Sequence, residues 1–142
     1  MTDTDRSQDL SRFVTAQHEV YPRALAELRA GEKRSHWMWF VFPQIAGLGR
    51  SDMARRYAIR DLAEAQAYLA DPVLGPHLRE CMAAVLAHAD MRTAEAIFGA
   101  IDAVKLRSSM TLFEAAGDDR ACAEMLDAFL GGERESETVR LL

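Results

Sequence analysis

Cysteine is scarce in this sequence. Only two of the 142 residues are cysteines, Cys81 and Cys122, and each lies alone within an apolar helical pattern. Two separated cysteines supply neither a disulfide framework nor the paired ligands of a zinc site. The four histidines show no ligand spacing, so no metal site is predicted. We expect both cysteines to be buried free thiols.

Long apolar runs are also missing. No segment approaches the roughly 18 apolar residues that a membrane-spanning helix needs, so no membrane partner is predicted. Residues 1–6 are polar and acidic rather than basic and then apolar, which argues against a secretory signal. The sequence therefore predicts a cytoplasmic protein.

Positive charge is limited overall but locally concentrated. The net charge of −5 disfavours a protein that binds nucleic acid over its whole surface. The stretch from Arg23 to Arg60 nevertheless holds eight Lys and Arg residues against three Asp and Glu, a local charge of +5. Such a stretch could meet an anionic partner. The alternative is that these arginines lie on solvated helix faces and make ordinary surface pairs.

The distribution of helix signals predicts an all-α fold. Length and an apolar fraction of 49% fit a single domain, with capping residues and helical spacing throughout and no strand alternation. We expect a compact domain of about seven to eight helices over residues 10–142, behind a loosely ordered N-terminus at residues 1–9. The expected helical segments lie at about 10–17, 23–30, 35–42, 52–59, 61–69, 73–89, 94–98, 102–115, 122–130 and 136–142.

Three of these segments contain residues that affect where a helix begins, breaks or forms at all. Pro22 is expected in the first turn of a separate second helix. Residues 35–42 could form a buried strand or a buried helix, and the helical neighbours favour a helix. The segment 73–89 could break at Gly75-Pro76.

The segment from Gly31 to Gln44 is the first candidate site. Its centre, Trp37 to Phe42, is rich in aromatic side chains, and the plainest interpretation is hydrophobic core. Polar residues at its edges allow a second interpretation, because an aromatic wall with a few convergent polar groups is typical of a ligand pocket. His36 could then act as a general acid or base, although a lone histidine beside aromatic residues is more often a structural residue. The side chains concerned are Lys33, His36, Trp37, Trp39 and Gln44.

Two further segments carry polar motifs. Gly47-Leu48-Gly49-Arg50-Ser51 enters a helix and could bind an anion through backbone N–H groups, or Ser51 could simply cap the helix. On a helix, Lys105 and Ser109 share a face. A Ser–Lys nucleophile pair is conceivable there, but hydroxyls in a helix more commonly bond back to carbonyls of their own helix. Ser108 and Thr111 share another edge of the same helix. No dinucleotide fingerprint, phosphate loop or nucleophile elbow occurs, so no cofactor is predicted.

These segments together resemble one known family. The motifs are Leu10-x-Arg12-Phe13, His36-Trp37-Met38-Trp39-Phe40, Phe42-Pro43-Gln44, Gly47-Leu48-Gly49-x-Ser51, Tyr57-Ala58-Ile59, and Asp102 followed by Lys105-Leu106-x-Ser108-Ser109-Met110-Thr111-Leu112-Phe113. They resemble the bacterial family catalogued as domain of unknown function 1810, from about residue 10 to residue 142. The chain departs from the family pattern at His77, Cys122 and Glu135.

The resemblance implies a compact all-α domain and supplies no established activity. Members are sometimes labelled calpastatin-like, but calpastatin-type inhibitors are extended and repetitive, and this chain is neither. The family motifs nominate Lys33, His36, Gln44, Ser51, Tyr57, Lys105, Ser108 and Ser109 as site residues.

The leading functional hypothesis is a pocket for a phosphorylated or nucleotide-like anion, in a protein that could be an enzyme. His36 would be the catalytic residue. The ligand-binding residues would be Lys33, Trp37, Trp39, Gln44, Arg50, Ser51, Tyr57, Lys105, Ser108 and Ser109. The alternative is a non-catalytic module that binds a protein partner, and a nucleic-acid partner is disfavoured. The sequence sets neither the oligomeric state nor the ligand's identity.

Overall fold

Nine helices form the regular structure of residues 2–142, the part of the chain that the computed structural model describes, with side chains described from Leu10 onward except that of Asp119. In chain order they are α1 (Thr2–Ala30), α2 (Met38–Val41), α3 (Asp52–Arg56), α4 (Leu62–Ala70), α5 (Leu74–Leu86), α6 (Ala94–Phe98), α7 (Ala100–Ala116), α8 (Asp119–Phe129) and α9 (Ser136–Leu141). Over these residues the all-α prediction is confirmed.

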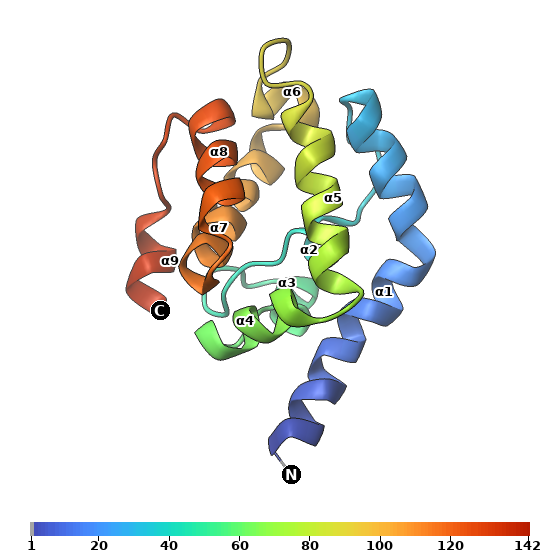
Figure 1. The fold of residues 1–142 in the computed structure, drawn as a ribbon, viewed down its shortest axis with the longest axis vertical. Helices are drawn as coiled ribbons and strands as arrows, with labels where there is room; N and C mark the ends of the chain where they lie inside the picture. Colours follow the sequence, from blue (N-terminus) through green and yellow to red (C-terminus); the bar gives the residue numbers. More distant parts are fainter. Residues whose placement is uncertain (1) are drawn as a thin grey trace.

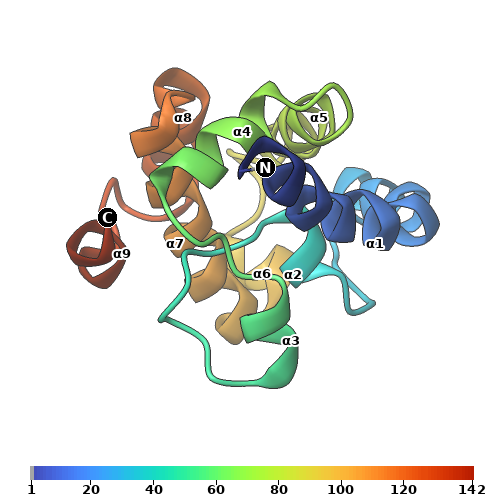
Figure 2. The same cartoon turned by 90° about the horizontal axis from the view of Figure 1, so that it is seen from below.

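Helix α1 lies on one side of the molecule and α8 and α9 lie on the other, with α7 between them (Figure 1 and Figure 2). Helix α1 packs against α5, while α7 contacts both α4 and α8. The ring of Tyr68 on α4 joins these layers, because it contacts Phe13 at 5.3 Å and Phe113 at 5.1 Å between ring centroids. All three side chains are fully buried.

Side-chain caps begin several helices at the positions that the sequence predicts. Ser51 Oγ accepts a hydrogen bond from Ala54 N at 3.1 Å, Asp61 Oδ1 accepts from Glu64 N at 2.8 Å, and Thr93 Oγ1 accepts from Ala96 N at 3.0 Å. Each satisfies an N–H group that has no acceptor within its own helix. These local signals therefore set the starts of α3, α4 and α6.

The N-terminal region forms one helix where two were predicted. Helix α1 continues through Pro22, although an internal proline loses a backbone hydrogen bond and costs about 3 kcal/mol. Pro22 is exposed, whereas Phe13, Gln17 and Leu28 are buried along one face. Burial of that continuous face offsets the proline. Loose order of residues 1–9 stays a prediction, and Met1 lies outside the described residues.

The segment between α1 and α4 also departs from expectation. Of the predicted helix at 35–42 only α2 forms, and Pro43 follows it. The helix expected to reach Ile59 ends at Arg56, because Ile59 instead pairs with Ile45 in an isolated parallel bridge. Ile59 N donates to Gln44 O at 2.8 Å, and Ala46 N donates to Ile59 O at 2.7 Å. This pairing ties the loop after α2 to the loop before α4.

Two further expectations concern α5 and the cysteines. Helix α5 runs through Gly75-Pro76 without a break and ends at Leu86, three residues short of the predicted end at Ala89. Cys81 and Cys122 are buried free thiols, as predicted. Burial raises the pKa of Cys81 to about 12, so it remains a thiol at neutral pH. None of the helices in the described part is long and apolar enough to cross a membrane.

Candidate functional site

A cleft of about 420 Å³ opens between the segment that follows α1 and the first turn of α7. The segment from Lys33 to Trp39 forms one wall, and Phe98 to Lys105 form the other. The lining side chains and glycine are Lys33, His36, Met38, Trp39, Phe98, Gly99, Ala100, Ile101, Asp102 and Lys105. The volume lies within the range of about 300–1,000 Å³ that is usual for small-molecule sites.

Two lysines in the cleft share one carboxylate. Lys33 Nζ lies 2.9 Å from Asp102 Oδ2, and Lys105 Nζ lies 3.3 Å from Asp102 Oδ1. The Lys33 side chain is only 8% exposed, and that of Lys105 is 25% exposed. A buried ammonium needs a counter-ion, which Asp102 supplies. The cluster retains a charge of +1, since two cations face one anion.

The start of α7 adds to this positive potential. Gly99 precedes the helix with a φ of 83° and provides no side-chain cap, so the N–H groups of the first turn have no acceptor within α7. The aligned peptide dipoles place roughly half a positive charge at this end. Gly99, Ala100 and Ile101 line the cleft. The lysines and the helix terminus therefore act on the same space.

Aromatic rings lie beside both lysines. Lys105 Nζ lies 5.0 Å from the centroid of the Trp39 ring, and Lys33 Nζ lies 5.1 Å from that of Trp37. Trp39 is half-buried and lines the cleft, whereas Trp37 is only 1% exposed and belongs to the core. Of the two tryptophans, Trp39 is therefore the one that presents its ring to the cleft.

The wall that carries His36 is held by Glu27 on α1. Glu27 Oε1 accepts hydrogen bonds from Arg34 N at 2.8 Å, Ser35 N at 3.1 Å and Trp37 Nε1 at 2.9 Å, and its Oε2 accepts from Ser35 Oγ at 2.5 Å. Burial raises the pKa of this carboxyl, but the four hydrogen bonds outweigh it and lower the pKa to about 2. Glu27 therefore clamps the segment 34–37 beside the cleft.

His36 is exposed at the edge of the cleft and makes no hydrogen bond within the described part of the chain. It also lines a second hollow of about 430 Å³, whose other side chains include Glu19 and Arg23 of α1. The two hollows therefore meet at the imidazole. Its ring is accessible to a ligand from either side.

Gln44 and Tyr57 are half-buried and are not among the residues that line the cleft. With Trp39 and Lys105 they line a separate small hollow of about 10 Å³, room for about one water molecule. Tyr57 also packs its ring on Phe40, with 4.7 Å between centroids. Trp39 and Lys105 therefore line both the cleft and this small hollow.

The other predicted site residues lie elsewhere. Ser51 caps α3, and Arg50 is exposed and lines none of the hollows described here. Ser108 is buried and its Oγ donates back to Val104 O at 3.3 Å, while the buried Ser109 Oγ has no hydrogen-bond partner among the described residues. Lys105 pairs with Asp102, so the structure provides no Ser–Lys pair. The Ser108 and Ser109 motif belongs to the core of α7.

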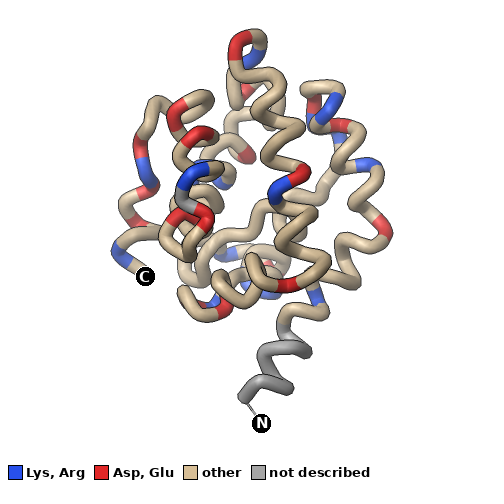
Figure 3. The backbone as a smooth tube through the Cα atoms, in the orientation of Figure 1, with Lys and Arg blue, Asp and Glu red and all other residues tan. Residues whose placement is uncertain are grey.

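Many basic side chains of the stretch from Arg23 to Arg60 make pairs with acids. Arg29 lies 3.7 Å from Glu80 and Arg34 lies 3.4 Å from Glu32. In Figure 3, Lys and Arg alternate with Asp and Glu along the chain instead of filling one continuous segment. Much of this stretch therefore makes ordinary ion pairs, which was the alternative to an anionic partner.

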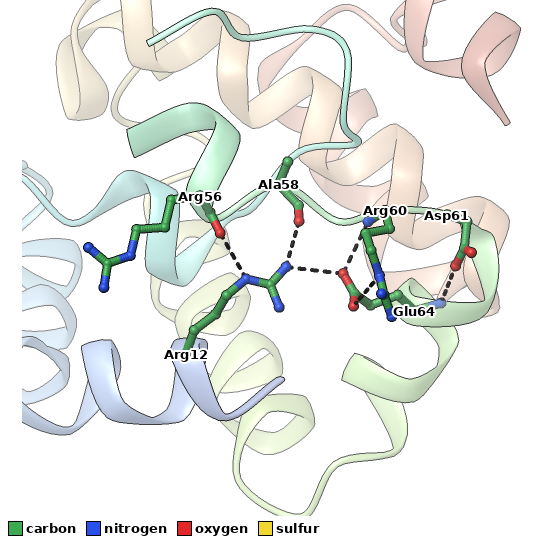
Figure 4. Close-up of polar contacts among 6 residues, drawn as sticks. All are labelled: Arg12, Arg56, Ala58, Arg60, Asp61 and Glu64. Carbon is green, nitrogen blue, oxygen red and sulfur yellow. Dashed lines mark hydrogen bonds and ion pairs between the residues drawn. The ribbon is translucent and has the colours of Figure 1, made fainter. Parts of the chain in front are cut away.

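A second polar cluster joins α1 to the start of α4 (Figure 4). Arg12 Nε donates to Arg56 O at 2.8 Å, and its Nη2 donates to Ala58 O at 2.7 Å and to Glu64 Oε1 at 3.2 Å. Glu64 is 1% exposed and also accepts from Arg60 N at 3.0 Å. The cluster fixes the backbone around Tyr57.

A third polar group lies beneath α2. Gln17 Nε2 donates to Phe40 O at 2.6 Å, and Gln17 Oε1 lies 2.8 Å from His77 Nδ1. Burial lowers the pKa of His77, and its ring stacks on Tyr21 at 3.6 Å. His77 therefore supports the end of α2 from inside and lines none of the clefts described above.

Sequence reasoning missed two residues that shape the cleft, Asp102 and Glu27. The three-residue spacing of Asp102 and Lys105 on one helix is a signal that could have paired them. Glu27 had no such signal, because its partners lie seven to ten residues away in a loop.

Comparison with known proteins agrees with this fold. The family described as protein of unknown function (DUF1810) matches residues 7–142. The crystal structure of a conserved hypothetical protein from Mycobacterium tuberculosis is 52% identical, with a TM-score of 0.91 over 94% of this chain and 96% of that chain. No curated protein matches the chain. A match over nearly the whole length shows that the chain belongs to the DUF1810 family.

Proposed function

We propose that the cleft between residues 33–39 and the start of α7 binds a small anionic molecule that is phosphorylated or nucleotide-like. The observation that carries this proposal is the cluster of Lys33, Asp102 and Lys105 at the N-terminus of α7. Two ammonium groups and a helix terminus are oriented toward one space, in which a negative group would be stabilised.

The donors of the cluster are only partly used. Each ammonium has three N–H donors, and Asp102 engages each lysine through one carboxylate oxygen. The remaining donors and the first-turn N–H groups of α7 are available to an acceptor. A phosphate brings several strong acceptor oxygens, which suits such a set.

The apolar wall fits a planar ring. Trp39, Met38 and Phe98 line the cleft beside the two lysines. A ring stacked on Trp39 would bury apolar area close to its anionic group. His36 at the edge is the side chain we propose as acid–base group if the bound molecule reacts. We propose that this function is cytoplasmic.

Thermal denaturation with a panel of anionic metabolites tests the proposal. A ligand at 100 times its Kd adds about 2.7 kcal/mol to the free energy of unfolding, enough to raise Tm by several degrees. Lys105→Met should roughly halve the shift, because a tenfold weaker ligand at the same concentration adds only about 1.4 kcal/mol, whereas Arg55→Met, an exposed control on α3, should retain the full shift. If no anion in the panel raises Tm, the proposal is wrong.

A protein partner is the second candidate, and one observation favours it. Ile101 and Val104 on α7 are 76% and 58% exposed, and Ile101 also lines the cleft. Exposed apolar side chains beside a site often mark a contact surface. In a pull-down, loss of a partner on Ile101→Ser with anion binding intact would support this candidate.

A further inference from the structure

The charge of the cleft restricts which anion fits. Lys33 and Lys105 contribute two positive charges and Asp102 one negative charge, and the start of α7 adds roughly half a positive charge. The lining therefore carries about +1.5. Among the residues that the structure describes, Asp102 supplies the only carboxylate in the lining of the cleft.

A phosphate monoester carries about −1.5 to −2 at pH 7, which nearly balances this charge. A nucleoside triphosphate carries more negative charge than the lining can neutralise. Sites that hold polyphosphates use further cations, a metal ion or a glycine-rich loop of N–H groups. In the described part of the chain no group of acidic, histidine or cysteine side chains could hold a metal ion, and Asp102 opposes each added phosphate.

The positions of the charges also favour a ligand with a single phosphate group. The Lys33 side chain is more than nine-tenths buried and is joined to Asp102 at 2.9 Å. An anion that reaches both lysines must therefore lie beside the Asp102 carboxylate. One compact group faces that carboxylate once and gains contacts from both lysines and the first turn of α7 in return. A longer chain of phosphates would either pass the carboxylate or extend into solvent without gaining a contact.

We infer that the cleft selects a ligand with a single phosphoryl group beside a planar ring and discriminates against di- and triphosphates. This inference rests on the proposed function and adds the number of phosphates. Asp102 determines the preference for one phosphate over several, and Trp39 provides the surface on which the planar ring of the ligand stacks.

Calorimetric titration of the wild-type protein with adenosine and its 5′-mono-, di- and triphosphates, without Mg²⁺, tests the inference. We expect the monophosphate to bind at least about tenfold more tightly than adenosine, because only the monophosphate engages the lysines. Its affinity should equal or exceed that of the triphosphate. Affinity that rises from mono- to triphosphate overturns the inference while leaving the proposed function intact. If none of the four compounds binds, this inference is overturned, and the metabolite panel described above decides the proposed function.

Asp102→Asn provides the sharper comparison. It removes the negative charge while keeping a side chain of similar shape, so the lining becomes more positive by one unit. The ratio of triphosphate to monophosphate affinity should then rise at least about threefold. Glu124→Gln, an exposed change of the same charge on α8, should leave the ratio unchanged. An unchanged ratio in a folded Asp102→Asn protein contradicts the role of Asp102, and the wild-type series decides the matter if that variant does not fold.

Discussion

The cleft and the junction between α1 and α4 both hold buried charges, but they use their donors differently. At the junction, Arg12 donates to two backbone carbonyls and to Glu64. In the cleft, Lys33 and Lys105 share only the carboxylate of Asp102. A guanidinium whose donors meet fixed backbone oxygens holds the fold together. Ammonium groups with donors to spare beside an open volume can bind a ligand.

The largest expected effect breaks the junction. Arg12→Met should lower the free energy of unfolding by about 3 kcal/mol, because it removes one partner of the buried Glu64 carboxylate. Denaturant titration measures the loss. The same substitution at exposed Arg55 should change stability by no more than about 0.5 kcal/mol. Similar small values for both variants would show that the junction is not structural.

Glu27→Gln tests the clamp that holds one wall of the cleft, with an expected loss of about 1–2 kcal/mol at pH 7, because charge-assisted hydrogen bonds become neutral. The pKa of Glu27 is lowered from 4.5 to about 2. Its contribution is therefore complete above about 4.5 and is lost as the pH falls toward 2. Unfolding curves of both proteins between pH 7 and pH 2 should converge at the acid end. If the difference in unfolding free energy between the two proteins stays constant or increases toward low pH, the stabilising role of the Glu27 carboxylate is wrong.

Lys33→Met and Lys105→Met separate binding from stability. We expect each to change the free energy of unfolding by less than about 1 kcal/mol, because Asp102 keeps the other lysine as its partner. Anion affinity should fall about tenfold. Calorimetry with a mononucleotide and denaturant titration of the same samples give both quantities. If a lysine variant loses several kcal/mol of unfolding free energy but binds the anion normally, the lysines stabilise the fold and do not bind the ligand, which contradicts the prediction.

Ser109→Ala carries the smallest expected effect. Its buried hydroxyl has no hydrogen-bond partner in the described part of the chain, so its removal should leave stability unchanged or raise it by up to about 1 kcal/mol. Anion affinity should not change, since Ser109 lines none of the clefts. A marked loss of binding would restore the hypothesis that Ser109 belongs to the site.

Local rules predicted much of the fold. Ser51, Asp61 and Thr93 cap helices as their sequence positions suggest, because a cap depends on residues three positions apart. The same rules were wrong where distant contacts decide the outcome. Pro22 lies inside α1 because the apolar face on both sides of it packs continuously. Ile59 leaves the helical pattern because Ile45 pairs with it.

The predicted site residues also fall into those that line the cleft and those that do not. The sequence indicated Lys33, His36, Trp39 and Lys105, all of which line the cleft. It also nominated Trp37, Ser108 and Ser109, which are buried in the core. Residue type alone does not distinguish the two groups, because a tryptophan or a serine has the same chemistry on either face of a segment. Helix rotation and loop path determine which side chain meets solvent.

By itself, the sequence determined the helical class, the family and the starts of several helices, because spacing and capping act over a few residues. Tertiary structure alone decided that Asp102 would join Lys33 to Lys105 and that Glu27 would hold the opposite wall. Lys33 and Asp102 lie 69 positions apart in the chain, so no local signal predicts their contact. Only packing of α7 against the segment after α1 brings these charges together.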